Sequence, residues 1–136
     1  MNCNELSLHL IEENPGDEER LPFHYFNIIR KEEIIGKISI RFGNNAHSYY
    51  NGHVGFEIYP KHRGNNYAFQ AVTLILKIAK KHGMNEIYLT CKQSNTASRK
   101  IFEKLRATLV EIAKIPRNCF FYRDGIEDYA IYRLQL

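Results

Sequence analysis

The feature that most constrains this fold is a change of hydrophobic period at Pro60. Before it, residues 53–60 (HVGFEIYP) form a short apolar run that predicts a β-strand stopped by the proline. After it come a polar loop, residues 61–66 (KHRGNN), and an amphipathic pattern over 68–82 that predicts an α-helix with a broad buried face. A strand that continues through a short loop into a helix predicts a sheet with a helix packed on it.

Alternating apolar residues predict further strands on both sides of this unit. The predicted strands span residues 5–12, 23–31, 34–42, 53–60, 86–92, 108–115 and 128–136, with a second helix over 95–107 and a loop over 44–52. The strand–helix–strand from 54 to 91 should pair in parallel with a right-handed crossover. We therefore expect an α/β or α+β fold with one mixed sheet of about seven strands and two main helices.

Length and composition indicate one domain over residues 1–136. The hydrophobic share of 44% and the charged share of 25% are ordinary for a soluble protein, and a chain of 136 residues can bury a sizeable core. No apolar run approaches the roughly 20 residues of a membrane span. The acidic N-terminal segment lacks the basic-then-apolar pattern of a signal peptide. We expect a cytoplasmic protein without a membrane partner.

The spacing of cysteine and histidine argues against a metal site. Cys3, Cys91 and Cys119 are odd in number and form no Cys-x-x-Cys motif, and the six histidines contain no His-x-x-x-His pair. We expect neither a disulfide framework nor a bound metal, and we interpret Cys91 as a small core residue.

The charge is distributed unevenly along the chain. Residues 1–35 carry eight acidic and three basic residues, whereas residues 60–123 carry thirteen basic and three acidic ones, a net charge of +10. A basic surface attracts anions of any kind, including phosphates and nucleic acid. A solvated face is the simpler interpretation of the charge alone.

The loop after Pro60 has the residues of a phosphate-binding turn. A helix N-terminus leaves unpaired N–H groups and about half a positive charge. Gly64 permits a positive φ and close backbone approach, and Arg63 offers a planar fork of donors to phosphate oxygens. These residues favour phosphate, best as a pyrophosphate, with a plain strand-to-helix turn as the alternative.

The stretch from Arg63 to Ala68 (RGNNYA) resembles the Arg/Gln-x-x-Gly-x-Gly/Ala signature of the GNAT superfamily of N-acetyltransferases, with Asn66 in place of the central glycine. Asparagine tolerates positive φ, so the turn should survive. Residues 51–60 resemble the strand before that signature, and residues 88–111 (YLTCKQSNTASRKIFEKLRATLVE) resemble the later strand and helix. The resemblance covers roughly residues 23–136 and is closest to small bacterial acetyltransferases of unassigned substrate.

The resemblance implies an acetyl-CoA-dependent enzyme that moves an acetyl group directly to a primary amine of a small molecule or peptide. Acetyl-CoA is the implied donor, and the two strands around its thioester are implied to splay apart. The implied CoA-binding residues are Ile58, Tyr59, Arg63, Gly64, Asn65, Asn66, Tyr67, Ala68, Asn95, Ser98 and Lys100. Ile58 and Tyr59 would act through backbone N–H groups. Asn95 and Ser98 have an alternative as helix-capping residues, and Lys100 has one as part of a solvated face.

Four residues are candidates for proton transfer. His53 and Glu57 share one face of the predicted strand and could form a base pair or a water relay, with Glu57 preferred because it is nearer the loop. A half-exposed strand face that simply carries polar residues is the alternative. The family's usual tyrosine acid is matched here by Phe102, which leaves Tyr122 and Tyr132 as candidates. Ordinary packing is the alternative for both tyrosines.

The first connection departs from the family. Only residues 13–22 join the first two strands, where members normally have one or two helices, so this helical pair should be reduced or absent. The acceptor side should then be open or be completed by another chain, which leaves a homodimer as an alternative. A non-catalytic acyl-CoA-binding or regulatory module and, less favoured, a nucleic-acid-binding domain stay open as other functions.

Overall fold

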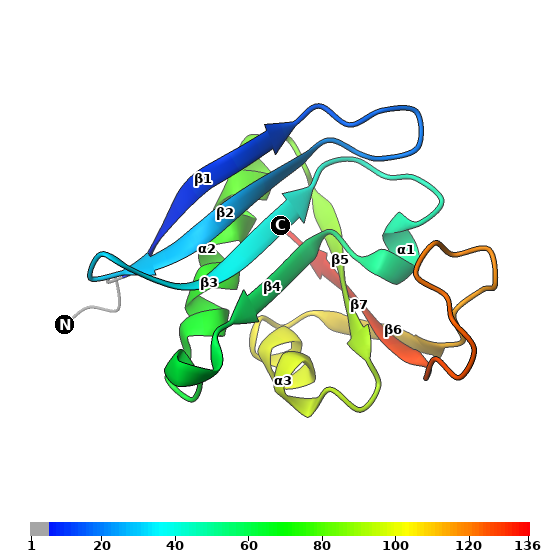
Figure 1. The fold of residues 1–136 in the computed structure, drawn as a ribbon. Helices are drawn as coiled ribbons and strands as arrows, with labels where there is room; N and C mark the ends of the chain where they lie inside the picture. Colours follow the sequence, from blue (N-terminus) through cyan, green and yellow to red (C-terminus); the bar gives the residue numbers. More distant parts are fainter. Residues whose placement is uncertain (1–5) are drawn as a thin grey trace. The chain divides into compact units, whose positions relative to one another are not determined.

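The structure is a computed structural model that describes residues 6–136 (Figure 1). Cys3 and Glu5, the first residue of the first predicted strand, lie outside the described residues. The strands are β1 (Leu6–Asn14), β2 (Phe23–Arg30), β3 (Glu33–Arg41), β4 (Val54–Ile58), β5 (Glu86–Lys92), β6 (Thr108–Ala113) and β7 (Tyr129–Gln135). The helices are α1 (Ser48–Asn51), α2 (Tyr67–Lys81) and α3 (Thr96–Lys104), with a 3₁₀ turn η1 at Pro60–His62.

The chain forms two compact units, each built from segments that are not continuous in sequence. The first contains residues 6–43 and Val54–Met84, and the second contains Asn44–His53 and Asn85–Leu136. The α+β class with seven strands and two main helices is confirmed. The prediction of a single domain stays a prediction.

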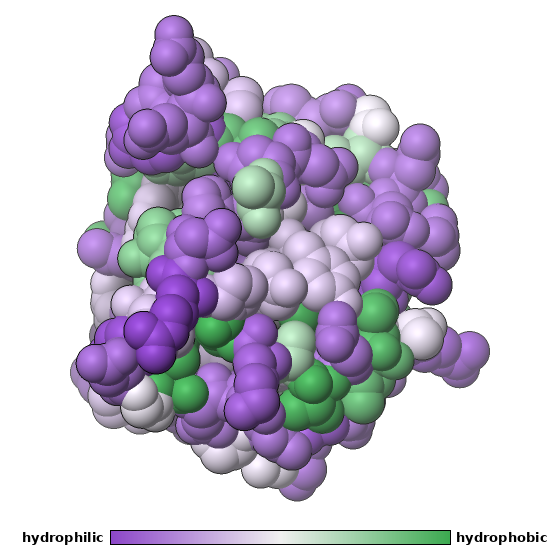
Figure 2. All heavy atoms as spheres, turned by 90° about the vertical axis from the view of Figure 1, so that its right-hand side faces the viewer, coloured by the Kyte–Doolittle hydropathy of each residue, from purple (hydrophilic) through white to green (hydrophobic). Residues whose placement is uncertain are grey.

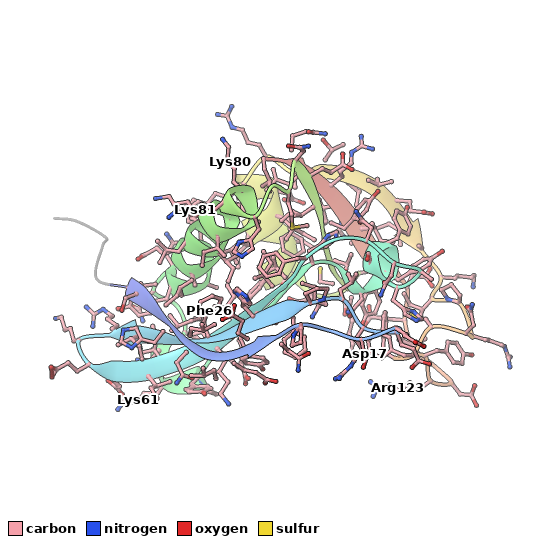
Figure 3. All side chains as sticks on the ribbon, turned by 90° about the horizontal axis from the view of Figure 1, so that it is seen from above. Asp17, Phe26, Lys61, Lys80, Lys81 and Arg123 are labelled. Atoms are coloured by element: carbon pink, nitrogen blue, oxygen red, sulfur yellow. The ribbon has the colours of Figure 1, made fainter. Side chains whose placement is uncertain are left out.

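The first unit is an antiparallel sheet, β1-β2-β3-β4, with α2 packed against one face. Alternate strand residues supply this face, because successive side chains point to opposite sides of a sheet. Phe26 is one of them and projects toward α2 (Figure 3). The buried residues of this unit include Leu6, Phe26, Ile28, Ile35, Ile38, Ile40, Val54 and Ile58 from the strands and Ala71, Val72, Ile75 and Ala79 from α2.

Helix α2 ends as its sequence predicts. Lys80 and Lys81 occupy its last turn (Figure 3), where the helix dipole favours cations. Gly83 follows at φ +83°, and its N–H donates to Lys80 O while Met84 N–H donates to Ala79 O. This left-handed cap satisfies carbonyls that the last helical turn leaves open.

The second unit is an antiparallel sheet of order β5-β7-β6. Phe102 of α3 is buried and packs edge-to-face against Tyr132 of β7 at 5.2 Å between ring centroids. Tyr88 and Thr90 point to the opposite face, where α1 contacts β5 and β7. The two faces of this sheet therefore carry different helices.

The predicted parallel pairing between residues 54 and 91 is wrong. Strands β4 and β5 lie at the edges of two different sheets, and every strand pair among the described residues is antiparallel. Side chains take bonds that a parallel ladder would use. Tyr88 N–H donates to His53 Nδ1 (2.9 Å), and Ile58 O accepts a bond from Arg63 Nε (2.7 Å).

Two local predictions also change. The loop predicted over 44–52 contains the short helix α1, and the strand predicted over 53–60 is limited to β4, so His53 lies just before it. Residues 15–22 contain no helix, which confirms the reduced first connection. None of the helices in residues 6–136 is both long and apolar enough to cross a membrane.

Candidate functional site

The loop before α2 adopts the turn that its sequence predicts. Gly64 has φ +86° and Asn66 has φ +66°, so two left-handed residues flank Asn65. A Cβ built on Gly64 would meet no atom within 4 Å, which shows open space beside its backbone. Asn65 Nδ2 donates to His62 O (3.1 Å) and Arg63 O (3.3 Å) and so fixes the turn from inside. Residues of alternating hand bring successive N–H groups together, an arrangement that suits an anion.

The first N–H groups of α2 complete this turn. Gln70 N–H donates to Asn66 O, which is the first helical bond, so the N–H groups of Tyr67 and Ala68 precede the helical ladder. The Asn66 side chain makes no capping bond. The backbone of residues 64–68 can therefore offer donors to a phosphate group.

Arg63 is held in place by β4. Its Nε donates to Ile58 O (2.7 Å), which leaves the terminal guanidinium nitrogens as further donors. Glu33 lies near the preceding turn, 3.1 Å from His62 Nε2 and 3.6 Å from Lys61 Nζ. The acid balances part of the positive charge at η1, whereas Arg63 lies within the turn itself.

The N–H groups of the two predicted backbone donors, Ile58 and Tyr59, point to opposite sides of their strand. Tyr59 N–H donates to Ile35 O of β3 (2.9 Å), so it is already used. Hydrogen-bonding direction alternates along an antiparallel strand, so the Ile58 N–H points away from β3, toward the edge of the sheet. Ile58 is therefore the better donor of the pair.

The two residues predicted as a base pair or water relay, His53 and Glu57, do not lie on one strand face. Glu57 is exposed on the sheet face opposite α2, where it lies across from Lys37 of β3. His53 precedes β4, is 1% exposed and belongs to the second unit. Its Nδ1 accepts the bond from Tyr88 N–H, and its ring stacks on Tyr88 at 5.9 Å. His53 thus does not share a β4 face with Glu57, and its role in the reaction stays a prediction.

Asn95 caps α3. Its Oδ1 accepts a bond from Ser98 N–H (3.1 Å), and its own carbonyl accepts from Arg99 N–H. Ser94, just before it, is bound by Glu127 through both its N–H and its Oγ (3.0 and 2.8 Å), and these bonds lower the pKa of Glu127. The Asn95 side-chain amide keeps its Nδ2 donors, while Ser98 is half-buried and Lys100 is exposed.

The two candidate tyrosine acids have different surroundings. Tyr132 is 1% exposed, and its hydroxyl accepts from Arg99 Nε (3.0 Å) and donates to Glu103 Oε2 (3.2 Å). Tyr122 is half-buried in the segment between β6 and β7, and its hydroxyl donates to Asp124 Oδ1 (3.4 Å). Tyr132 is buried and its hydroxyl makes two hydrogen bonds within the protein, so Tyr122 is the more accessible of the two.

The remaining candidates are the Cys91 thiol and side-chain groups that could hold a metal ion. Burial raises the pKa of the Cys91 thiol to about 11, which confirms it as a core residue and keeps it protonated. In the described part of the chain, no group of three or more His, Cys, Asp or Glu side chains is placed to hold a metal ion.

Sequence reasoning missed a cluster of Tyr49, Tyr50, Tyr88 and Glu111 in the second unit. Tyr49 and Tyr50 lie in the segment predicted as a loop, and Glu111 lies in a strand with an irregular register. The adjacent tyrosines were the available signal, but their contacts with β5 and β6 depend on long-range packing.

Comparisons with known proteins agree on one family. Residues 5–108 match the family model described as acetyltransferase (GNAT) domain. Among solved structures, the spermidine/spermine N-acetyltransferase SpeG from Vibrio cholerae, in mutant forms, superposes with a TM-score of 0.72 at 14% identity, over 96% of this chain and 94% of that one. No curated protein matches the sequence significantly.

Two further structures show the same fold. An acetyltransferase from Salmonella typhimurium that modifies the N-terminal serine of ribosomal protein L7/L12 gives a TM-score of 0.67 at 16% identity, over 84% of this chain and 64% of that one. A GNAT-family acetyltransferase from Bacillus anthracis gives 0.66 at 23% identity, over 82% and 65%. The chain thus spans less than two thirds of these two structures.

Proposed function

The chain belongs to the GNAT acetyltransferase family, and from this premise we propose that it is an acetyl-CoA-dependent N-acetyltransferase. The acetyl group moves directly to a primary amine of a small molecule or peptide. The observation that carries the proposal is the turn at Gly64 and Asn66. These two left-handed residues bring backbone N–H groups together at the start of α2. We place this activity in the cytoplasm and in a single domain, with a homodimer as an alternative assembly.

The residues fit the phosphate end of acetyl-CoA, which supplies the acetyl thioester. The N–H groups of residues 64–68 receive the pyrophosphate, and the Arg63 guanidinium adds charged donors. Asn65 shapes the turn, and Asn66 provides the left-handed residue at which the signature has glycine. In α3, the Asn95 amide contacts the CoA arm, and Ser98 and Lys100 contribute from the first turns.

Acetyl transfer needs a donor for the carbonyl oxygen and a group that removes the amine proton. The edge-facing N–H of Ile58 serves as the oxyanion donor, since the Tyr59 N–H is bound to β3. Glu57 accepts the amine proton through a water molecule, because a carboxylate alone is a poor base toward an ammonium ion. Tyr122 is the proposed donor to the leaving thiolate, because the Tyr132 hydroxyl is held between Arg99 and Glu103.

One observation favours a second function. Phe102 stands where many members have the tyrosine acid, and it is 2% exposed, so no hydroxyl is available at that position. A protein that binds acyl-CoA without transferring the acyl group would need the turn at residues 63–68 but no acid.

Release of free thiol from acetyl-CoA in the presence of a panel of amines tests the proposal, with calorimetric CoA binding measured in parallel. Thiol release that depends on both an amine and acetyl-CoA supports the enzyme. CoA binding without thiol release for any amine supports the non-catalytic module. Absence of CoA binding would overturn both functions.

A further inference from the structure

Three tyrosine rings from separate parts of the second unit meet at one place. Tyr49 and Tyr50 belong to α1, and Tyr88 belongs to β5. The Tyr49 ring lies 5.1 Å from Tyr50 and 5.2 Å from Tyr88, edge-to-face in both pairs. All three rings are half-buried. Figure 2 views the side on which α1 lies in Figure 1, and it shows weakly hydrophilic residues bordered by strongly hydrophilic ones and, below, by hydrophobic ones.

Short contacts hold this tyrosine cluster (Tyr49, Tyr50 and Tyr88) against β5. Thr90 Oγ1 donates to Tyr50 O (2.9 Å), and His53 N–H donates to Tyr88 O (2.9 Å). Gly52, at φ +74°, lets the segment approach, because a Cβ there would lie 3.1 Å from Thr90 Oγ1. The rings are thus fixed by backbone and side-chain bonds and not by ring packing alone.

A β-bulge brings a carboxylate to the cluster. The pairing of β6 with β7 shifts between Leu109, opposite Tyr132, and Glu111, opposite Ile131. In an unbroken register Glu111 would face Ala130 and point to the α3 side of the sheet. The extra residue turns Glu111 to the α1 side, where it accepts a hydrogen bond from the Tyr49 hydroxyl.

The carboxylate has no cationic partner in the described part of the chain. Glu111 appears in no ion pair there, and Arg133, on the same sheet face, pairs with Glu86 Oε2 at 3.8 Å. Burial of the hydroxyl and its bond to Glu111 raise the pKa of Tyr49 to about 12, so Tyr49 stays a neutral donor. The cluster therefore combines one negative charge with three neutral aromatic rings.

This combination suits an organic cation. An ammonium group is attracted to the faces of aromatic rings and to a carboxylate, and the two attractions act together when the groups are partly desolvated. We propose that the tyrosine cluster and Glu111 bind an alkylammonium group, and that this group belongs to the amine acceptor. The assignment to the acceptor rests on the proposed function, whereas the binding of a cation does not.

Binding of cadaverine and of the diol of the same chain length, measured by calorimetry without acetyl-CoA, tests the site. Cadaverine should bind and the diol should not. Glu111→Gln should weaken cadaverine binding about two- to fivefold, the upper range for a partly exposed charge pair. Tyr49→Phe keeps the aromatic ring and releases the Glu111 carboxylate from the Tyr49 hydroxyl, so this variant should retain its affinity for cadaverine. Tyr49→Leu removes the ring and should lose affinity for cadaverine, as Glu111→Gln does. Glu18→Gln, at an exposed acid of the first unit, is the control and should leave cadaverine binding unchanged.

Equal binding of cadaverine and the diol, or unchanged binding by Glu111→Gln, would overturn the site. A free-amine peptide compared with its N-acetylated form shows whether a peptide amine is bound in the same way. The two proposals fail separately. Cadaverine binding with no acetyl transfer to any amine of the panel removes the enzyme and keeps the cation site. Acetyl transfer to cadaverine with an unchanged kcat/KM in Glu111→Gln removes the acceptor assignment and keeps the enzyme.

Discussion

At the scale of single residues, three side chains take the place of regular backbone structure near the candidate site. Asn66 occupies a left-handed position where the family signature has glycine, and Arg63 occupies an edge carbonyl of β4. His53 Nδ1 likewise occupies a strand backbone group, since it accepts the hydrogen bond from the Tyr88 N–H. Each supplies a bond or a conformation that a strand ladder or a glycine would otherwise supply.

The Arg63 guanidinium should carry a measurable part of CoA binding. Arg63→Ala removes charged donors beside the turn, and hydrogen bonds to charged groups contribute about 1.5–3 kcal/mol. Acetyl-CoA affinity measured by calorimetry should fall by that amount. Lys61→Ala is the control, because the Lys61 side chain is exposed and pairs with Glu33, and it should have a smaller effect. Equal affinity in wild type and Arg63→Ala would contradict the proposed pyrophosphate site.

Glu57 should matter most where the acceptor is largely protonated. Glu57→Gln removes the proposed route for the amine proton, so kcat should fall most at neutral pH and less as the pH rises and more amine is already neutral. The pH dependence of kcat for both proteins checks this. Lys37→Gln, on the neighbouring strand position, serves as the control. A pH profile that keeps its wild-type shape would exclude Glu57 as the base.

At the scale of elements, α3 ends in a cap that its sequence disfavours. Arg106 has φ +67°, and the bonds from Arg106 N–H to Glu103 O and from Ala107 N–H to Phe102 O close the helix around it. Arg106→Gly should raise the free energy of unfolding by about 1 kcal/mol, because glycine adopts this conformation without a steric penalty. Chemical denaturation measures the change. As the control, Lys104→Gly, inside the same helix, should lower the free energy of unfolding by about 1 kcal/mol. A lower free energy of unfolding in Arg106→Gly would contradict the argument.

The hydrogen bonds that Ser94 donates to Glu127 should make the start of α3 sensitive to acid. The pKa of Glu127 is lowered by the hydrogen bonds from the Ser94 side chain and backbone, so the folded state favours its ionised form. This stability is present above the ordinary glutamate pKa and is lost as the pH falls through the lowered value. Glu127→Gln should therefore lose less of its thermal stability than wild type between neutral and acidic pH. Glu18→Gln, at an exposed acid, should retain the wild-type slope.

Most elements could be predicted because their signals are local. The residues of β5 match the predicted strand over 86–92, and α2 begins one residue before the predicted helix. The sheet pairing could not be predicted in the same way, because it depends on contacts between segments far apart in sequence, and β4 pairs with β3 while β5 pairs with β7. Glu111 shows the same limit, since a single bulge in β6 changes the face on which its carboxylate lies. Periodicity predicts which residues form a strand, and tertiary hydrogen bonds decide what that strand faces.

At the scale of the whole molecule, the uneven charge of the chain bears on its proposed ligand. Residues 60–123 carry a net charge of +10 and contain both the turn before α2 and helix α3. CoA carries several phosphate charges, so a basic surface should raise its local concentration and its association rate. Such long-range attraction between exposed charges is screened by salt, with a Debye length of about 10 Å at 0.1 M and about 3 Å at 1 M.

The affinity for acetyl-CoA should therefore decrease as salt rises over this range, and the affinity for dephospho-CoA, which lacks one phosphate, should decrease less. The contrast follows because the lost phosphate removes charge without changing the pyrophosphate that the turn at Gly64 and Asn66 receives. Association and dissociation rates measured by stopped flow should place most of the salt effect in association, since steering acts before contact. Equal salt dependence for the two ligands would mean that the basic residues are only a solvated surface and that the turn binds CoA through short-range donors alone.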